Sequence, residues 1–217
     1  MVSRAFTSEI ARQVVSVSAC AVSAVFVVLL RLLKITWCID AAGKLKLDAL
    51  LIDDKPTIIV FWHGHMVPLL AVLNRYSASV LSSSGFRGTV IGRIAEAFGN
   101  ISLQVGHPDT NSSLQAVLVG QTGLLAIAVD GPLGPYHEVK RGAIILSATC
   151  AARIVPVSVR VRPAVYLRRW DRMVLPPPFA RFSVCVGRPM HFARGDLKRP
   201  DCAGEIVRAA LEELEYC

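Results

Sequence analysis

The sequence predicts an α/β fold: a single domain with a mostly parallel central sheet flanked by helices, preceded by an N-terminal hydrophobic helix. Three observations lead to this prediction. Apolar runs of strand length recur from residue 55 onward, helix-like segments separate them, and the connections between them are short. Strands that alternate with helices are joined by right-handed crossovers, which place neighbouring strands parallel.

The predicted strands follow from hydrophobicity. Thr57 to Trp62 and Leu124 to Val129 are almost continuously apolar, as expected for strands that are buried on both faces. Further strands are expected over Ala78 to Ser82, Ile101 to Val105, Ile154 to Val161 and Phe179 to Val186. The last of these alternates more strongly, which indicates a late or edge strand.

The predicted helices follow from spacing and from their end signals. In Met66 to Tyr76, Pro68 falls in the first turn, where a proline is tolerated. Thr89 to Phe98 places its apolar residues on one face, and Gly99 ends it. Other helices are expected over Gly142 to Ala152, over Glu205 to Tyr216, and after a Thr110 cap with Leu114, Val117 and Leu118 on its apolar face.

Composition favours contact with a membrane. Hydrophobic residues make up 53% of the 217 residues and charged residues only 18%, and the formal net charge is +8. A basic and apolar protein suits anionic lipid head groups. Only 7% of residues are aromatic, and no basic tract is interleaved with aromatics, so no nucleic-acid partner is expected.

The N-terminal segment is interpreted as a membrane anchor. No charged residue occurs from Gln13 to Leu30, a helical length of roughly 27 Å, which is just short of the hydrocarbon core. The alternatives of spanning the bilayer and lying in its interface stay open. Basic residues downstream of the segment favour a cytoplasmic main domain. We therefore expect an anchor segment at residues 1–34, an α/β domain at 35–217, and a location on the cytoplasmic face of a bacterial inner membrane.

His63 is the first candidate for chemistry. It follows a predicted buried strand in the stretch Phe61-Trp62-His63-Gly64-His65, and the carboxyl ends of parallel strands line ligand crevices. A buried histidine bonded to backbone is the alternative. His63, His65 and His107 could form a metal site, but carboxylates at ligand spacing are missing, so no metal is expected.

The loop after the other buried strand is the second candidate. Two glycines and two prolines stiffen the stretch Asp130-Gly131-Pro132-Leu133-Gly134-Pro135, and Lys140 follows closely. A plain turn with a surface aspartate is the alternative. Glycine-rich nucleotide-binding patterns and a serine-nucleophile pattern are both absent from the sequence, so no cofactor is expected.

Several motifs, in order over roughly residues 40 to 192, resemble one family. They are Phe61-Trp62-His63-Gly64, the loop from Asp130 to Pro135, Val139-Lys140-Arg141-Gly142-Ala143, Ile154-Val155-Pro156-Val157, Trp170-Asp171-Arg172 and Pro177-Pro178-Phe179-Ala180-Arg181. The chain is thereby similar to the lysophospholipid acyltransferase superfamily, in its bacterial branch once classed as a domain of unknown function (DUF374).

The resemblance implies an acyltransferase. His63 would act as the general base on a hydroxyl of a lysophospholipid or lipid A-type acceptor, and acyl-coenzyme A or acyl-carrier protein would be the thioester donor. Substrate binding is implied for Asp130, Gly131, Pro132, Gly134, Pro135, Lys140 and Pro156. Membrane lipids are the implied partners.

This chain departs from the family pattern at three places. Pro68 stands where the superfamily commonly has an aspartate that orients the histidine, and Arg87 stands where the branch has an acid. Val105 stands where the branch has an arginine. Asp109 or Asp130 is then the expected partner of His63. A non-catalytic lipid-binding or assembly protein on the same fold and a metal-dependent hydrolase are the alternative functions.

Overall fold

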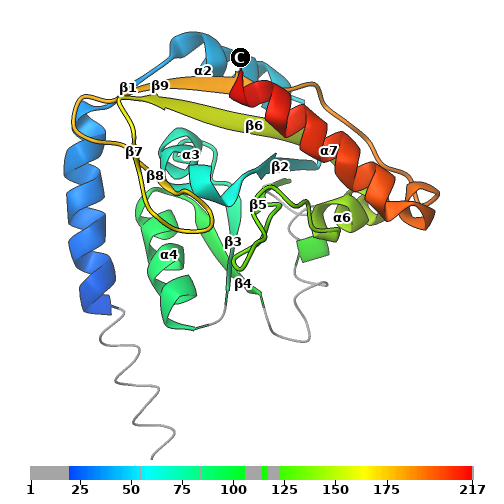
Figure 1. The fold of residues 1–217 in the computed structure, drawn as a ribbon, viewed down its shortest axis with the longest axis horizontal. Coiled ribbons are helices and arrows are strands. Elements are labelled where there is room, and N and C mark those ends of the chain that lie inside the picture. The colour runs from blue at the N-terminus through cyan, green and yellow to red at the C-terminus, as the bar shows by residue number, and fades with distance from the viewer. Residues whose placement is uncertain (1–19, 54, 84, 106–113, 117–122, 217) are drawn as a thin grey trace, which may run out of the picture.

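A seven-stranded sheet forms the centre of the molecule, and the computed structural model describes residues 20–53, 55–83, 85–105, 114–116 and 123–216 of it (Figure 1). The strand order is β1-β9-β6-β2-β5-β3-β4. The strands are β1 (Cys38–Ile39), β2 (Thr57–Phe61), β3 (Ser79–Ser83), β4 (Ile101–Val105), β5 (Leu124–Ala128), β6 (Arg153–Arg162) and β9 (Arg181–Val186). A separate short hairpin consists of β7 (Val165–Tyr166) and β8 (Val174–Leu175).

The sheet is mostly parallel, as the sequence predicts. β2 pairs in parallel with both β5 and β6, and β3 pairs in parallel with β4 and β5. β9 runs antiparallel to β6 and pairs on its other side with the two-residue strand β1. The alternating pattern of the last strand therefore marked a position near the sheet edge.

Helices cover both faces of the sheet. They are α2 (Ala41–Leu51), α3 (Met66–Leu73), α4 (Phe86–Ala97), α6 (Gly142–Cys150) and α7 (Pro200–Glu215), with 3-10 turns η1 (His63–His65) and η2 (Asp196–Lys198). The helices α3, α4, α6 and α7 match predicted helices to within a few residues. The helix expected after Thr110 lies outside the described residues for most of its length. β1 and α2 were not predicted, although Asp40 caps α2 by accepting hydrogen bonds from the amides of Ala42 and Gly43.

Two hydrophobic cores lie on the two faces of the sheet, and β2 contributes to both. Ile59 and Phe61 pack into the core that contains α3 and α4, whereas Ile58 and Val60 pack into the core of α6 and α7. All five residues of β2 are buried. This explains why the strand is continuously apolar up to the point where it leaves the sheet.

The N-terminal helix is described from residue 20 to residue 36 and lies beside α4 (Figure 1). The Arg31 guanidinium donates to the carbonyl of Ala97, and the Lys34 ammonium lies 5.2 Å from the ring centroid of Phe98. Of the predicted anchor segment at residues 1–34, residues 1–19 lie outside the described residues. Within the part of the chain that the structure describes, no helix is both long and apolar enough to cross a bilayer.

Candidate active site

His63 lies just beyond the carboxyl end of β2, at the end of the sheet where the parallel strands terminate. The strand ends at Phe61, and the chain turns at once through η1 into α3. Gly64 allows another segment to pack closely on this turn, because a Cβ built on it would lie 2.3 Å from the carbonyl oxygen of Asp171. The turn is therefore packed directly against the loop between β7 and β8, here called the β7–β8 hairpin loop (residues 167–173).

That loop supplies a carboxylate to the His63 ring. Nδ1 of His63 lies 3.0 Å from Oδ2 of Asp171, whose side chain is fully buried. A carboxylate only accepts hydrogen bonds, so the neutral imidazole donates from Nδ1–H and carries its lone pair on Nε2. Arg169 also lies 3.3 Å from Asp171 Oδ2. This is the base-and-orienter geometry of general-base sites.

Burial and charge act on His63 in opposite directions. Desolvation lowers the pKa of His63 below the ordinary value of 6.5, and this effect exceeds the opposing attraction of Asp171. The imidazole is therefore neutral at neutral pH, as a general base must be. About 10% of the side chain is exposed, and Nε2 has no hydrogen-bond partner among the described residues. Nε2 is thus the atom left for a substrate proton.

Asp130 binds the backbone of the turn at His63 and does not bind the imidazole ring. Its Oδ1 accepts a hydrogen bond of 2.8 Å from the backbone amide of His63, and the residue is 1% exposed. Oδ2 is buried without a partner among the described residues, and desolvation raises the pKa of Asp130 to about 6. The expectation that Asp130 orients the imidazole was therefore wrong. Asp109, the other residue expected there, lies outside the described residues.

The rest of the predicted loop packs under the hairpin loop. A Cβ on Gly134 would lie 2.7 Å from the ring of Trp170, and the His63 and Trp170 rings are 5.5 Å apart. Gly131 and Gly134 both have positive φ, of 68° and 74°. Pro132 and Pro135 are exposed. The structure therefore joins the two predicted motifs through Trp170.

Two predicted site residues show no contact with the His63 ring among the described residues, although Lys140 borders the Asp130 loop, since a Cβ on Gly131 would lie 3.8 Å from its side chain. Lys140 is exposed, and its ammonium pairs with Glu138 at 2.5 Å. Pro156 is buried inside the sheet, paired with Val60 and in contact with Gly187. No group of three His, Cys, Asp or Glu side chains suitable for a metal ion occurs in the described part of the chain, which does not include His107.

Sequence reasoning missed Asp171 as the partner of His63. The two residues are 108 positions apart, so no local spacing connects them. The available signal was the stretch Trp170-Asp171-Arg172, which belonged to the motif set but carried no role. An aspartate flanked by bulky residues between two predicted strands was the residue to consider.

Comparison with known proteins adds little about function. No model of a known protein family matches the chain. It is 21% identical over 169 residues to uncharacterized protein RP090 of Rickettsia prowazekii (strain Madrid E), a match that covers 76% of this chain and 77% of that protein. The printed description of that relative gives no activity, so the site geometry carries the functional argument.

Proposed function

We propose that this protein is a membrane-associated acyltransferase of the lysophospholipid acyltransferase type, with His63 as its general base. The observation that carries the proposal is the 3.0 Å contact between His63 Nδ1 and the buried Asp171, with Nε2 free of protein partners among the described residues. The order of motifs along the sequence supports the same family.

The proposed reaction is a direct transfer. The acceptor hydroxyl gives its proton to His63 Nε2 as its oxygen attacks the carbonyl carbon of the acyl thioester. The carbon–sulfur bond then breaks, and the imidazolium returns the proton to the leaving thiolate. Asp171 stabilises the imidazolium between these two steps. Because no covalent enzyme intermediate forms, the absence of a nucleophile pattern from the sequence agrees with this route.

Asp171 supplies an orienting carboxylate, whose absence at Pro68 would argue against an active enzyme. Pro68 stands in place of the family's orienting aspartate, and a histidine with no carboxylate partner would favour the lipid-binding alternative. Asp171 approaches the same ring nitrogen from the hairpin loop and provides a partner from elsewhere in the chain. Arg87, at the second departure, is exposed.

Membrane contact is proposed through the N-terminal helix. Its exposed face carries large apolar side chains, namely Val22, Val25, Phe26, Val28, Leu29, Leu32 and Ile35. Arg31 and Lys34 lie on the same helix and suit anionic head groups. We propose that this face enters the cytoplasmic leaflet of a bacterial inner membrane, where the lipid acceptor is found.

The test is an acyl-transfer assay with wild-type protein and the His63→Ala variant. Donors are acyl-coenzyme A and acyl-carrier protein, and acceptors are a panel of lysophospholipids and lipid A precursors. We expect His63→Ala to lower turnover by about 10²- to 10⁴-fold, and the exposed His191→Ala to leave it unchanged. Equal turnover in His63→Ala would exclude the proposed base, and lipid binding without transfer to any acceptor would favour the non-catalytic alternative.

A further inference from the structure

The Asp171 carboxylate contacts more than the His63 ring. Its Oδ2 atom lies 3.0 Å from Nδ1 of His63 and 3.3 Å from Nη2 of Arg169, so an imidazole and a guanidinium share one carboxylate oxygen. Its Oδ1 atom accepts a hydrogen bond of 3.3 Å from the backbone amide of Met173. The carboxylate is fully buried, and a buried charge requires such partners.

The hairpin loop holds Arg169 beside this oxygen. The amide of Arg169 donates to the carbonyl of Leu167 at 2.9 Å, and its carbonyl accepts from the amide of Arg172 at 3.2 Å. A hydrogen bond of 3.0 Å from the Leu167 amide to the Met173 carbonyl closes the loop at its base. Arg169 and Asp171 therefore belong to one short turn whose backbone is tied at both ends.

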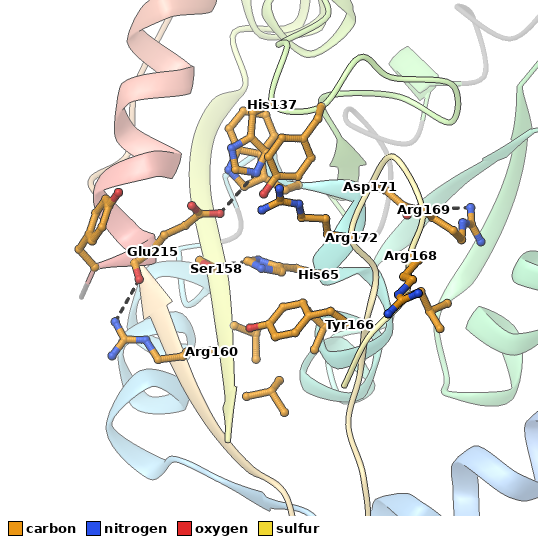
Figure 2. Close-up of a pocket in the computed structure, with 18 residues that line it drawn as sticks. His65, His137, Ser158, Arg160, Tyr166, Arg168, Arg169, Asp171, Arg172 and Glu215 are labelled. Atoms are coloured by element: carbon orange, nitrogen blue, oxygen red, sulfur yellow. Dashed lines mark hydrogen bonds and ion pairs between the residues drawn. The ribbon is translucent and has the colours of Figure 1, made fainter. Parts of the chain in front are cut away.

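Arg169 lies between the buried carboxylate and the protein surface. Its side chain is 43% exposed and lines a cavity of about 690 Å³, which Asp171 and His65 also line. In Figure 2, Arg169 and Arg172 project to opposite sides of the hairpin loop, and a dashed line joins Arg169 to Asp171. Among the described residues, Arg168 and Arg172 of the same loop pair with no carboxylate, so Arg169 is the arginine of this loop that serves Asp171.

The balance of charge at this oxygen changes when His63 takes up a proton. With a neutral ring, the Arg169 guanidinium faces the Asp171 carboxylate without a competing cation. With an imidazolium, two cations face the same Oδ2 atom and repel each other. Desolvation is the largest influence on the pKa of His63 and lowers it; Asp171 raises this pKa, and Arg169 lowers it. Arg169 thus weakens the hold on the proton that Asp171 creates.

The other titratable groups near this pair lie on the turn after β2 and on the loop after β5. Desolvation lowers the pKa of His65, on the same turn as His63, to about 4, so this ring is neutral at neutral pH. Asp130 binds the backbone amide of His63, and Lys140 acts on Asp130. Because burial raises the pKa of Asp130 to about 6, a measurement on the His63 ring itself is needed to separate the two titrations.

We propose that Arg169 is a positioning residue that acts on the His63 base through the shared Oδ2 atom of Asp171. It holds the carboxylate against the Nδ1–H of the ring, and it opposes the imidazolium, so that the proton taken from the acceptor hydroxyl passes on to the leaving thiolate. The fate of the proton rests on the proposed acyl transfer. The effect of Arg169 on the ring is a property of the protein alone and is measurable without a substrate.

The experiment measures the pKa of His63 by a nitrogen-15 NMR titration of histidine-labelled protein. Arg169→Gln and Arg169→Met remove the charge in two ways, Arg169→Lys keeps it, and the exposed Arg194→Gln is the matched control. We expect both charge-removing variants to raise the pKa of His63 by about 0.5 unit, because the guanidinium is partly screened by solvent. Arg169→Lys and the control should stay near the wild-type value. Thermal melts establish that each variant is folded.

The pH–rate profile of acyl transfer gives a second readout. Its acid limb should move to higher pH in Arg169→Gln, with the KM of the acceptor unchanged, because the ring then retains its proton more strongly. A His63 pKa that is unchanged or lowered in both charge-removing variants overturns the inference. A raised KM with an unmoved acid limb also overturns it and assigns Arg169 to substrate binding. Since the NMR titration needs no substrate, it stands even if acyl transfer is not found, and the two proposals fail separately.

Discussion

His63 and His65 occupy the same 3-10 turn, two residues apart, but the protein surrounds them differently. The Nδ1 atom of His63 meets the carboxylate of Asp171, whereas that of His65 meets the hydroxyl of Ser158. Burial lowers the pKa of both rings, yet only His63 has a carboxylate that opposes the shift; desolvation alone takes the pKa of His65 to about 4. Only His63 therefore has a carboxylate that stabilises its imidazolium form while it takes up and releases a proton.

Gly64 lies between the two rings and makes the difference possible. Its lack of a side chain lets the carbonyl of Asp171 approach, which brings the hairpin loop onto the turn. The same loop places Asp171 on one ring and Arg172 beside the cavity of the other. One hairpin loop thus contributes a carboxylate to the His63 ring and a guanidinium to the surroundings of His65.

Replacing the Asp171 carboxylate should have the largest effect, because it removes what distinguishes His63 from His65. We expect Asp171→Asn to lower acyl-transfer turnover by about 10²- to 10⁴-fold, because an amide no longer fixes the tautomer or stabilises the imidazolium. Steady-state assay of the purified variant measures the loss. Glu205→Gln, which changes an exposed carboxylate on α7, is the control, and wild-type turnover in folded Asp171→Asn would contradict the role of Asp171.

Separating the turn from the hairpin loop should have the next largest effect. A methyl group in Gly64→Ala would collide with the Asp171 carbonyl and displace the carboxylate from the ring, at a cost of about 10- to 10²-fold in turnover. Gly142→Ala is the matched control, because a Cβ there meets no atom within 4 Å. Equal activities of the two variants would show that close contact at Gly64 is unimportant.

The next prediction, with a smaller expected effect, concerns the contribution of His65 to the pH dependence of folding stability. The pKa of His65 is about 4 in the folded protein and 6.5 in the unfolded chain, so the unfolded state binds more protons between these values. Stability therefore falls as pH decreases from 6.5 to 4, by about 3 kcal/mol for this residue.

Chemical denaturation at several pH values checks this effect. His65→Gln should flatten the loss of stability over that window relative to wild type. His137 contributes with the same sign, and Asp130, whose pKa is raised to about 6, with the opposite sign. An unchanged slope in His65→Gln would mean that His65 titrates normally in the folded state.

The smallest expected effect is a shift in the acid limb of the pH–rate profile. Because the pKa of His63 is lowered, activity should persist below pH 6.5 and fall only as the ring becomes protonated. Asp171→Asn removes an attraction that raises this pKa, so its residual activity should persist to still lower pH. An acid limb at higher pH in Asp171→Asn than in the wild type would contradict the conclusion that Asp171 raises the pKa of His63.

The sheet and its covering helices were predictable because each depends on local periodicity. β2 and β5 were found from apolar runs, and α7 from its one apolar face. β1 was missed because two residues carry no pattern, and its pairing is set by β9, far along the chain. The position of His63 at the sheet edge followed from the strand, since parallel strands end at a common edge.

The candidate site was predictable only in part. Asp130 was correctly placed next to His63, because both follow neighbouring strands, but its bond to a backbone amide has no sequence signature. Asp171 is brought in by a hairpin whose position is determined by packing of Gly64 and Gly134. The close contacts of glycines, rather than any motif of acids and histidines, determine which carboxylate reaches the ring.

The protonation state of the His63 ring tests the central claim most directly, without any assumption about substrates. Nitrogen-15 NMR of histidine-labelled protein at neutral pH should show His63 as a neutral ring with the proton on Nδ1, and this state should change in Asp171→Asn. A proton on Nε2, or a tautomer equilibrium that Asp171→Asn leaves unaltered, would contradict a base held ready by that carboxylate.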